Sequence, residues 1–137
     1  MQFIPDNQIS VSGIEKGIFV CYEVKSCIED VYSGNGLNFF GEKNYIVTTV
    51  NCYKKILCDY HDWKFTRFLK EHYPESSDYY GILVAVPDGR TIEEELENPT
   101  PLDEENEWKL ETAMNCRKGP RKRSMTELMF CMLRSGK

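Results

Sequence analysis

The sequence predicts an α/β or α+β fold with a mixed central sheet of about four strands flanked by helices. Three observations support this prediction. Side chains alternate with period 2 on both sides of residues 13–16, two strand-like runs follow at 44–50 and 79–86, and amphipathic helical patterns begin at Asp62 and Ser124. The resulting order, β-β-α-β-α-β-α, is typical of a mixed sheet with helices between its strands. The chain of 137 residues has the length of a single domain, and we expect residues 1–137 to form one.

Residues 5–25 are predicted to form a β-hairpin, because apolar and polar side chains alternate on both of its arms. If residues 13–16 are its loop, the register places Asp6 directly across from Glu23. Lys25 follows two residues later, so its side chain leaves the same face of the strand as that of Glu23. The hairpin would therefore gather two carboxylates and an ammonium group.

Opposed carboxylates repel each other, so the pairing of Asp6 with Glu23 needs a physical reason. A divalent cation between them would supply one, because Mg²⁺ takes oxygen ligands from one or two carboxylates and from water. The ammonium of Lys25 could then orient one of those waters. The alternative is an ordinary hairpin whose polar face meets solvent.

The next elements follow from capping and periodicity. The capping-box spacing of Ser26 and Glu29 predicts a short helix at 27–33. Residues 44–50 alternate as a central strand, and residues 51–58 could form a short helix with weak periodicity.

The second half of the chain adds a helix, a strand and a final helix. Asp62 is expected to cap a helix that ends before Pro74, and the apolar run 79–86 suits a buried strand. Residues 108–116 could be strand or helix, and helix is weakly favoured. A second capping box at 124–127 opens the last helix, whose apolar face is rich in methionine.

Charge is unevenly distributed along the chain, whose formal net charge is −5. Residues 91–107, approximately, are predicted to be an acidic surface excursion, and residues 117–123 a basic loop. The acidic run contains Glu93, Glu94, Glu95, Glu97, Asp103, Glu104, Glu105 and Glu107. The basic run contains Arg117, Lys118, Arg121, Lys122 and Arg123.

The six cysteines are predicted to be reduced thiols in a cytosolic protein. No CxxC pair occurs, His61 and His72 lack zinc-finger spacing, and no leader peptide is expected. No apolar run approaches the ~20 residues that a membrane-spanning helix needs, so we expect no membrane partner.

The residues of the predicted hairpin also resemble a known pattern. Pro5-Asp6 and Glu23-Val24-Lys25 on two arms of a hairpin, with a helix after the lysine, are similar to the PD-(D/E)XK nuclease superfamily. Residues 26–45 look like the run that follows this motif in small nuclease-like proteins of bacteria and their phages. The resemblance is strong over residues 5–47 and looser toward the C-terminus.

This resemblance implies a restriction-endonuclease-like core that hydrolyses phosphodiester bonds of DNA with Mg²⁺ or Mn²⁺, in a bacterial cytoplasm. Asp6 and Glu23 would bind the metal, and the carbonyl of Val24 would add a ligand. Lys25 would position the attacking water and stabilise negative charge in the transition state. Arg117, Lys118, Arg121, Lys122 and Arg123 would contact the DNA backbone. The alternative for this basic cluster is a solvated loop.

The chain departs from the superfamily because the helix that usually precedes the aspartate is missing. The chain could be a shortened version, or a second copy or another partner chain could supply the helix. A third alternative is that the helix from Ser124 takes its place, with Glu127 substituting for a missing acid.

Two other functional classes stay open. The fold could be a catalytically weak or inactive binding module that acts on a host protein or DNA. It could also be an interaction domain whose hairpin acids are coincidental.

Overall fold

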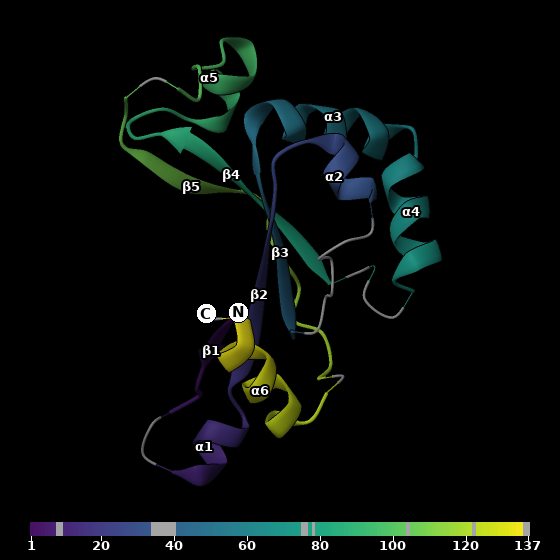
Figure 1. Cartoon of the computed structure of the whole chain (residues 1–137), viewed down its shortest axis with the longest axis vertical. Helices are drawn as coiled ribbons and strands as arrows, with labels where there is room; N and C mark the ends of the chain where they lie inside the picture. Colours follow the sequence, from purple (N-terminus) through teal and green to yellow (C-terminus); the bar gives the residue numbers. More distant parts are fainter. Residues whose placement is uncertain are drawn as a thin grey trace.

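The computed structural model describes residues 1–7, 10–33, 41–74, 77, 79–103, 105–121 and 123–135. In chain order, its elements are β1 (Gln2–Ile4), α1 (Val11–Glu15), β2 (Ile18–Lys25), α2 (Ile28–Tyr32), β3 (Lys43–Thr49), α3 (Val50–His61), α4 (Lys64–His72), β4 (Tyr80–Pro87), α5 (Ile92–Glu97), β5 (Trp108–Met114) and α6 (Met125–Ser135) (Figure 1).

The five strands that the structure describes form one mixed sheet in the order β1-β2-β3-β4-β5. The three central strands are parallel, and both outer strands pair antiparallel with their neighbours. The predicted α/β or α+β class with a mixed sheet is therefore confirmed, with five strands rather than about four. The additional strand is β5, where the weak preference for a helix at residues 108–116 was wrong. Pairing with β4 gives this segment backbone partners that its local sequence does not reveal.

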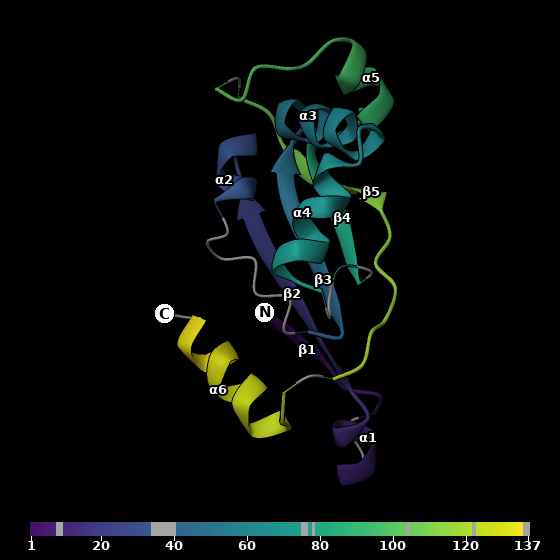
Figure 2. The same ribbon diagram turned by 90° about the vertical axis from the view of Figure 1, so that its right-hand side faces the viewer.

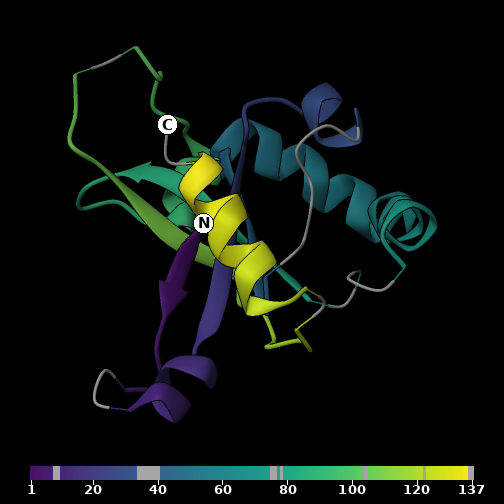
Figure 3. The ribbon, with the colours of Figure 1, turned by 60° about the horizontal axis from the view of Figure 1, so that its bottom comes forward.

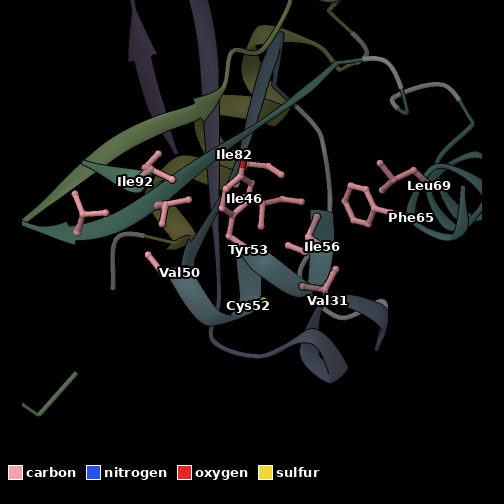
Figure 4. Close-up of a cluster of buried hydrophobic side chains, with 12 residues drawn as sticks. Val31, Ile46, Val50, Cys52, Tyr53, Ile56, Phe65, Leu69, Ile82 and Ile92 are labelled. Carbon is pink, nitrogen blue, oxygen red and sulfur yellow. The ribbon is translucent and has the colours of Figure 1, made fainter. Parts of the chain in front are cut away.

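Four helices, α2 to α5, cover one face of the sheet (Figure 2). Between the sheet and these helices lies a cluster of buried side chains that includes Ile46 and Ile82 from the strands and Ile56 and Phe65 from the helices (Figure 4). The strands and helices meet there because each presents an apolar face. On the opposite face, Val24 of β2 is 72% exposed.

The predicted helices form, with corrected boundaries. The helix expected at 27–33 is α2, but its N-cap is Cys27 rather than Ser26. The helix considered at 51–58 is longer, because α3 continues to His61. Asp62 ends α3 instead of capping α4, and Trp63 separates the two helices with a left-handed backbone at φ 63°. This backbone conformation changes the direction of the chain.

The acidic run is more structured than expected. Residues Ile92–Glu97 form α5, whose Ile92 belongs to the core cluster. Glu95 is only 1% exposed, and its carboxylate pairs with Arg90 and accepts two hydrogen bonds from Thr100. The prediction that residues 91–107 are a solvated excursion is therefore wrong for α5, where Glu95 is buried. The partners of Glu95 offset the cost of burying its charge.

The C-terminal segment crosses the start of the central strands before α6. Glu42, 3% exposed, accepts a hydrogen bond of 2.6 Å from the backbone N–H of Phe19. The same carboxylate pairs with Nε of Arg121 at 2.7 Å, and Arg121 also donates to the carbonyl of Gly17. The backbone N–H of Gly119 donates to the carbonyl of Glu42. These contacts hold β2, β3 and residues 119–121 together.

The last helix begins as predicted. The side chain of Ser124 accepts a hydrogen bond from the N–H of Glu127 and contacts the Glu127 carboxylate, so the predicted helix start at Ser124 is confirmed. Helix α6 lies away from α3 and α4, beside the lower part of the sheet (Figures 2 and 3). Of its predicted apolar face, Leu128 is fully buried, whereas Met129 is 37% exposed.

Replacing the buried carboxylate of Glu42 should destabilise the protein. In Glu42→Gln, Arg121 keeps the Gly17 carbonyl but loses its counter-ion. We expect the free energy of unfolding to fall by about 3 kcal/mol, the lower end of the range for a broken buried pair, because Arg121 is 26% exposed. Urea unfolding measures this loss.

Glu127→Gln is the matched control. It removes the exposed ion pair between Arg123 and Glu127, which should change the free energy of unfolding by less than about 1 kcal/mol. Equal losses in the two variants would contradict a structural role for Glu42.

Candidate functional site

The structure separates the two acids of the predicted hairpin. Strand β1 pairs with β2 from Gln2 opposite Val20 to Ile4 opposite Ile18, so Asp6 lies beyond the end of this pairing. Glu23 lies five residues along β2 from Ile18, which is roughly 16 Å. The predicted register and the proposed Asp6–Glu23 ligand pair are therefore wrong.

Local hydrogen bonds explain why the predicted hairpin register does not form. Helix α1 takes up residues 13–15 of the expected loop, and it is capped by Ser10, whose side chain accepts from the N–H of Gly13. The N–H of Ser10 donates to the side chain of Asn7, and the N–H of Asp6 donates to the carbonyl of Gly13. Such side-chain bonds compete with strand pairing. Residues 8 and 9 of the expected arm lie outside the described residues.

Glu23 and Lys25 leave the same face of β2, as predicted. Their partners on β3 are Ile46 and Thr48, and Ile46 belongs to the core under the helices. Both side chains therefore point to the face of the sheet that carries α2 to α5. Val24 points to the opposite face, and the role of its carbonyl as a metal ligand stays a prediction.

Lys25 is a buried cation at the end of β2, and its residue is only 4% exposed. Its Nζ lies 3.6 Å from Oδ1 of Asp30, in the first turn of α2. The carbonyl of Lys25 accepts a 2.7 Å hydrogen bond from Oγ1 of Thr48. The end of β2 is thus fixed to both α2 and β3.

Glu23 is half-buried, and its environment changes its proton affinity. Burial raises the pKa of the Glu23 carboxyl above its ordinary value, although the positive charges of Lys25 and the Met1 amino group act in the opposite direction. Burial also raises the pKa of the Tyr73 hydroxyl, and the nearby charge of Glu23 adds to that effect. The charges of Lys25 and of the Met1 amino group therefore act on Glu23, and the charge of Glu23 acts on the hydroxyl of Tyr73.

The predicted DNA-binding residues lie elsewhere: Arg121 is near the start of β2, and Arg117 borders a hollow with Trp63 and Thr66 beside α4. Arg121 belongs to the buried contact with Glu42, so it is not a free phosphate ligand. Arg117 and Lys118 are exposed, and Arg123 pairs with Glu127 at 3.8 Å. Lys122 lies outside the described residues. Glu127 therefore has a structural role at the start of α6.

A groove between α2, α3 and α4 is not marked by any of the predicted site residues. This groove has a volume of about 640 Å³, and a hollow of about 410 Å³ adjoins it at Tyr32 and Lys64. Lys54 and Lys55 border the larger hollow, and Arg67 borders the smaller one. The one feature of the sequence that points to this groove is the spacing of cations on the exposed faces of the helices.

Asp30 and Tyr73 were also missed as neighbours of the predicted site. Asp30 was visible only as an acid early in a predicted helix, and Tyr73 only as a residue before Pro74. The spacing of the sequence does not reveal the Asp30–Lys25 ion pair or the influence of Glu23 on Tyr73, because both depend on how the helices pack on the sheet.

Among the residues described, no group of three or more His, Cys, Asp or Glu side chains could hold a metal ion. No helix in the described part is long and apolar enough to span a membrane, and no disulfide joins the six cysteines. Comparison with protein-family models, with curated proteins and with solved structures found no match to this chain.

The raised pKa of Glu23 predicts a specific pH dependence of stability. The folded state holds this proton more tightly than the unfolded state, so ionisation costs stability as the pH rises from the ordinary value of 4.5 through the raised pKa. The stability of wild type relative to Glu23→Gln should therefore fall between acid and neutral pH. Urea unfolding of both proteins across this range measures the difference.

Glu95→Gln is the control of opposite sign. Burial raises the pKa of Glu95, but its hydrogen bonds from Thr100 and its pairing with Arg90 outweigh burial and lower it. The extra stability of wild type over this variant should be complete above the ordinary pKa of Glu95. It should be lost as the pH falls through the lowered pKa. The same trend in both variants would contradict the assignment for Glu23.

Proposed function

We propose that this chain is a metal-dependent nuclease that hydrolyses phosphodiester bonds of DNA, with Glu23 and Lys25 as its reacting groups and without Asp6. The observation that supports the proposal is the half-buried carboxylate of Glu23 beside the buried ammonium of Lys25 on one face of β2. The order of antiparallel β1–β2, helix α2 and parallel β3 is compatible with the motif that the sequence resembles.

Mg²⁺ or Mn²⁺ would be held through one carboxylate. Mg²⁺ is commonly held in proteins by one or two carboxylates, with waters and substrate phosphates as its other ligands. Glu23 would hold the cation, which would polarise the phosphoryl oxygens and lower the pKa of a bound water. Burial raises the pKa of the Glu23 carboxyl and so favours its protonated form. A bound cation would favour the deprotonated carboxylate instead.

Lys25 supplies the second part of the chemistry. Its ammonium can offset negative charge that develops on the phosphate, and burial strengthens this effect because little water screens it. It can also donate a hydrogen bond to the attacking water. The exposed Lys54, Lys55, Lys64 and Arg67 on α3 and α4 provide further cations for the DNA backbone.

A second candidate is a nuclease-like binding module without catalysis. The position of Asp6, beyond the β1–β2 pairing, leaves the site without the second carboxylate of the resemblance.

Nuclease assays separate the two candidates. Wild type should cleave supercoiled or single-stranded DNA in Mg²⁺ or Mn²⁺, and Glu23→Gln and Lys25→Met should each lower kcat by about 10²-fold or more, because each loses charge stabilisation of the transition state. Asp6→Asn is the matched control and should retain wild-type activity. Circular dichroism checks that each variant folds.

Two outcomes would contradict the nuclease proposal. If wild type is inert with every substrate and both metals, the binding-module candidate is favoured. If Asp6→Asn is as inactive as Glu23→Gln, the site is not the one built on β2. Stabilisation of wild type by Mn²⁺ in a thermal melt should also be absent in Glu23→Gln.

A further inference from the structure

We propose that Asp30 is a positioning residue that holds the ammonium of Lys25 beside Glu23. This inference rests on the proposed function, because Glu23 and Lys25 are its reacting groups. Asp30 would not touch the substrate and would act only through Lys25.

The path of the chain brings Asp30 back to the end of β2. Strand β2 ends at Lys25 and α2 begins three residues later, so the first turn of the helix returns toward the strand. Oδ1 of Asp30 then lies 3.6 Å from Nζ of Lys25. The Lys25 side chain is 5% exposed and that of Asp30 is 41% exposed, so one partner is buried and the other meets solvent.

Helix α2 is short, but two contacts fix its place. Val31, next to Asp30, is fully buried in the core cluster. The hydroxyl of Tyr32 donates a 2.7 Å hydrogen bond to Oδ2 of Asp59 on α3. Because α2 is anchored to α3 and to the core, the backbone of Asp30 is held at a fixed place relative to β2.

Lys25 needs such a restraint. A lysine side chain has four rotatable bonds, and a charged group is costly to bury without a partner. The backbone of Lys25 is fixed by Thr48, so the ion pair with Asp30 restrains the other end of the side chain. Both ends of the residue are then held, which places the ammonium within the electrostatic influence of Glu23.

A simpler role for Asp30 must be distinguished from positioning. An acid in the first turn of a helix interacts favourably with the helix dipole, and Glu29 occupies the same turn. Glu29 is exposed and borders the groove on the other side of α2. It therefore provides a matched control for the loss of one negative charge from this turn.

The test compares Asp30→Asn, Asp30→Glu and Glu29→Gln with wild type in two measurements. The first is the rate at which an amine-reactive acylating reagent labels Lys25, measured by mass spectrometry with the exposed Lys54 and Lys55 as internal references. We expect several-fold faster labelling of Lys25 in Asp30→Asn, and wild-type rates in Glu29→Gln. Asp30→Glu should restore slow labelling because it keeps the carboxylate.

The second measurement is steady-state DNA cleavage. Asp30→Asn should lower kcat by about 10²-fold with an unchanged KM, because a misplaced catalytic group costs rate rather than binding. Asp30→Glu should recover part of this loss, and Glu29→Gln should keep the wild-type kcat.

The two measurements fail independently. Equal labelling of Lys25 in wild type and Asp30→Asn, or equal acceleration in Asp30→Asn and Glu29→Gln, would overturn the assignment of Asp30. An inert wild type would overturn the proposed function, whereas the labelling result would still decide whether Asp30 restrains Lys25.

Discussion

The arrangement of the central strands depends on the contacts of the buried Glu42 carboxylate. It accepts a hydrogen bond from the N–H of Phe19 on β2 and pairs with Arg121 from the C-terminal segment, and Glu42 directly precedes β3. A charge with 3% exposure is tolerated only with such partners. The starts of β2 and β3 are therefore held side by side, and the parallel register that follows carries Glu23 next to Ile46 and Lys25 next to Thr48.

Strand β2 therefore has a distinct role at each end. At its start, Arg121 pairs with Glu42 and donates a hydrogen bond to the carbonyl of Gly17. At its other end, Lys25 pairs with Asp30, and its carbonyl accepts a hydrogen bond from Thr48. The first ion pair joins distant parts of the chain, whereas the second joins a strand to the helix that follows it. Only the second lies next to a carboxylate whose pKa is raised by burial.

Elements with a strong local signal were predictable from the sequence. The alternation in residues 44–50, the apolar run at 79–86 and the capping box at Ser124 each correspond to an element of the structure. The placement of Glu23 and Lys25 on one face also followed from period 2 alone. Register did not follow, because the pairing partner of β2 depended on whether Ser10 capped a helix or continued a strand. The alternation of side chains along one strand does not show which residues of another strand lie opposite them.

The separation of the two ends of β2 also constrains how DNA could meet the proposed site. Arg121 is fixed near Gly17 and Phe19, whereas Glu23 lies four residues beyond Phe19, or roughly 13 Å along the strand. A phosphate at Glu23 is therefore beyond the reach of Arg121, and Arg117 and Lys118 precede the same fixed segment. By contrast, Tyr73, which ends α4, is under the electrostatic influence of Glu23, and the exposed cations Lys64 and Arg67 belong to that helix. A DNA backbone along α4 would thus meet the exposed Lys64 and Arg67, and also the exposed Arg117, which borders a hollow with Thr66 of the same helix.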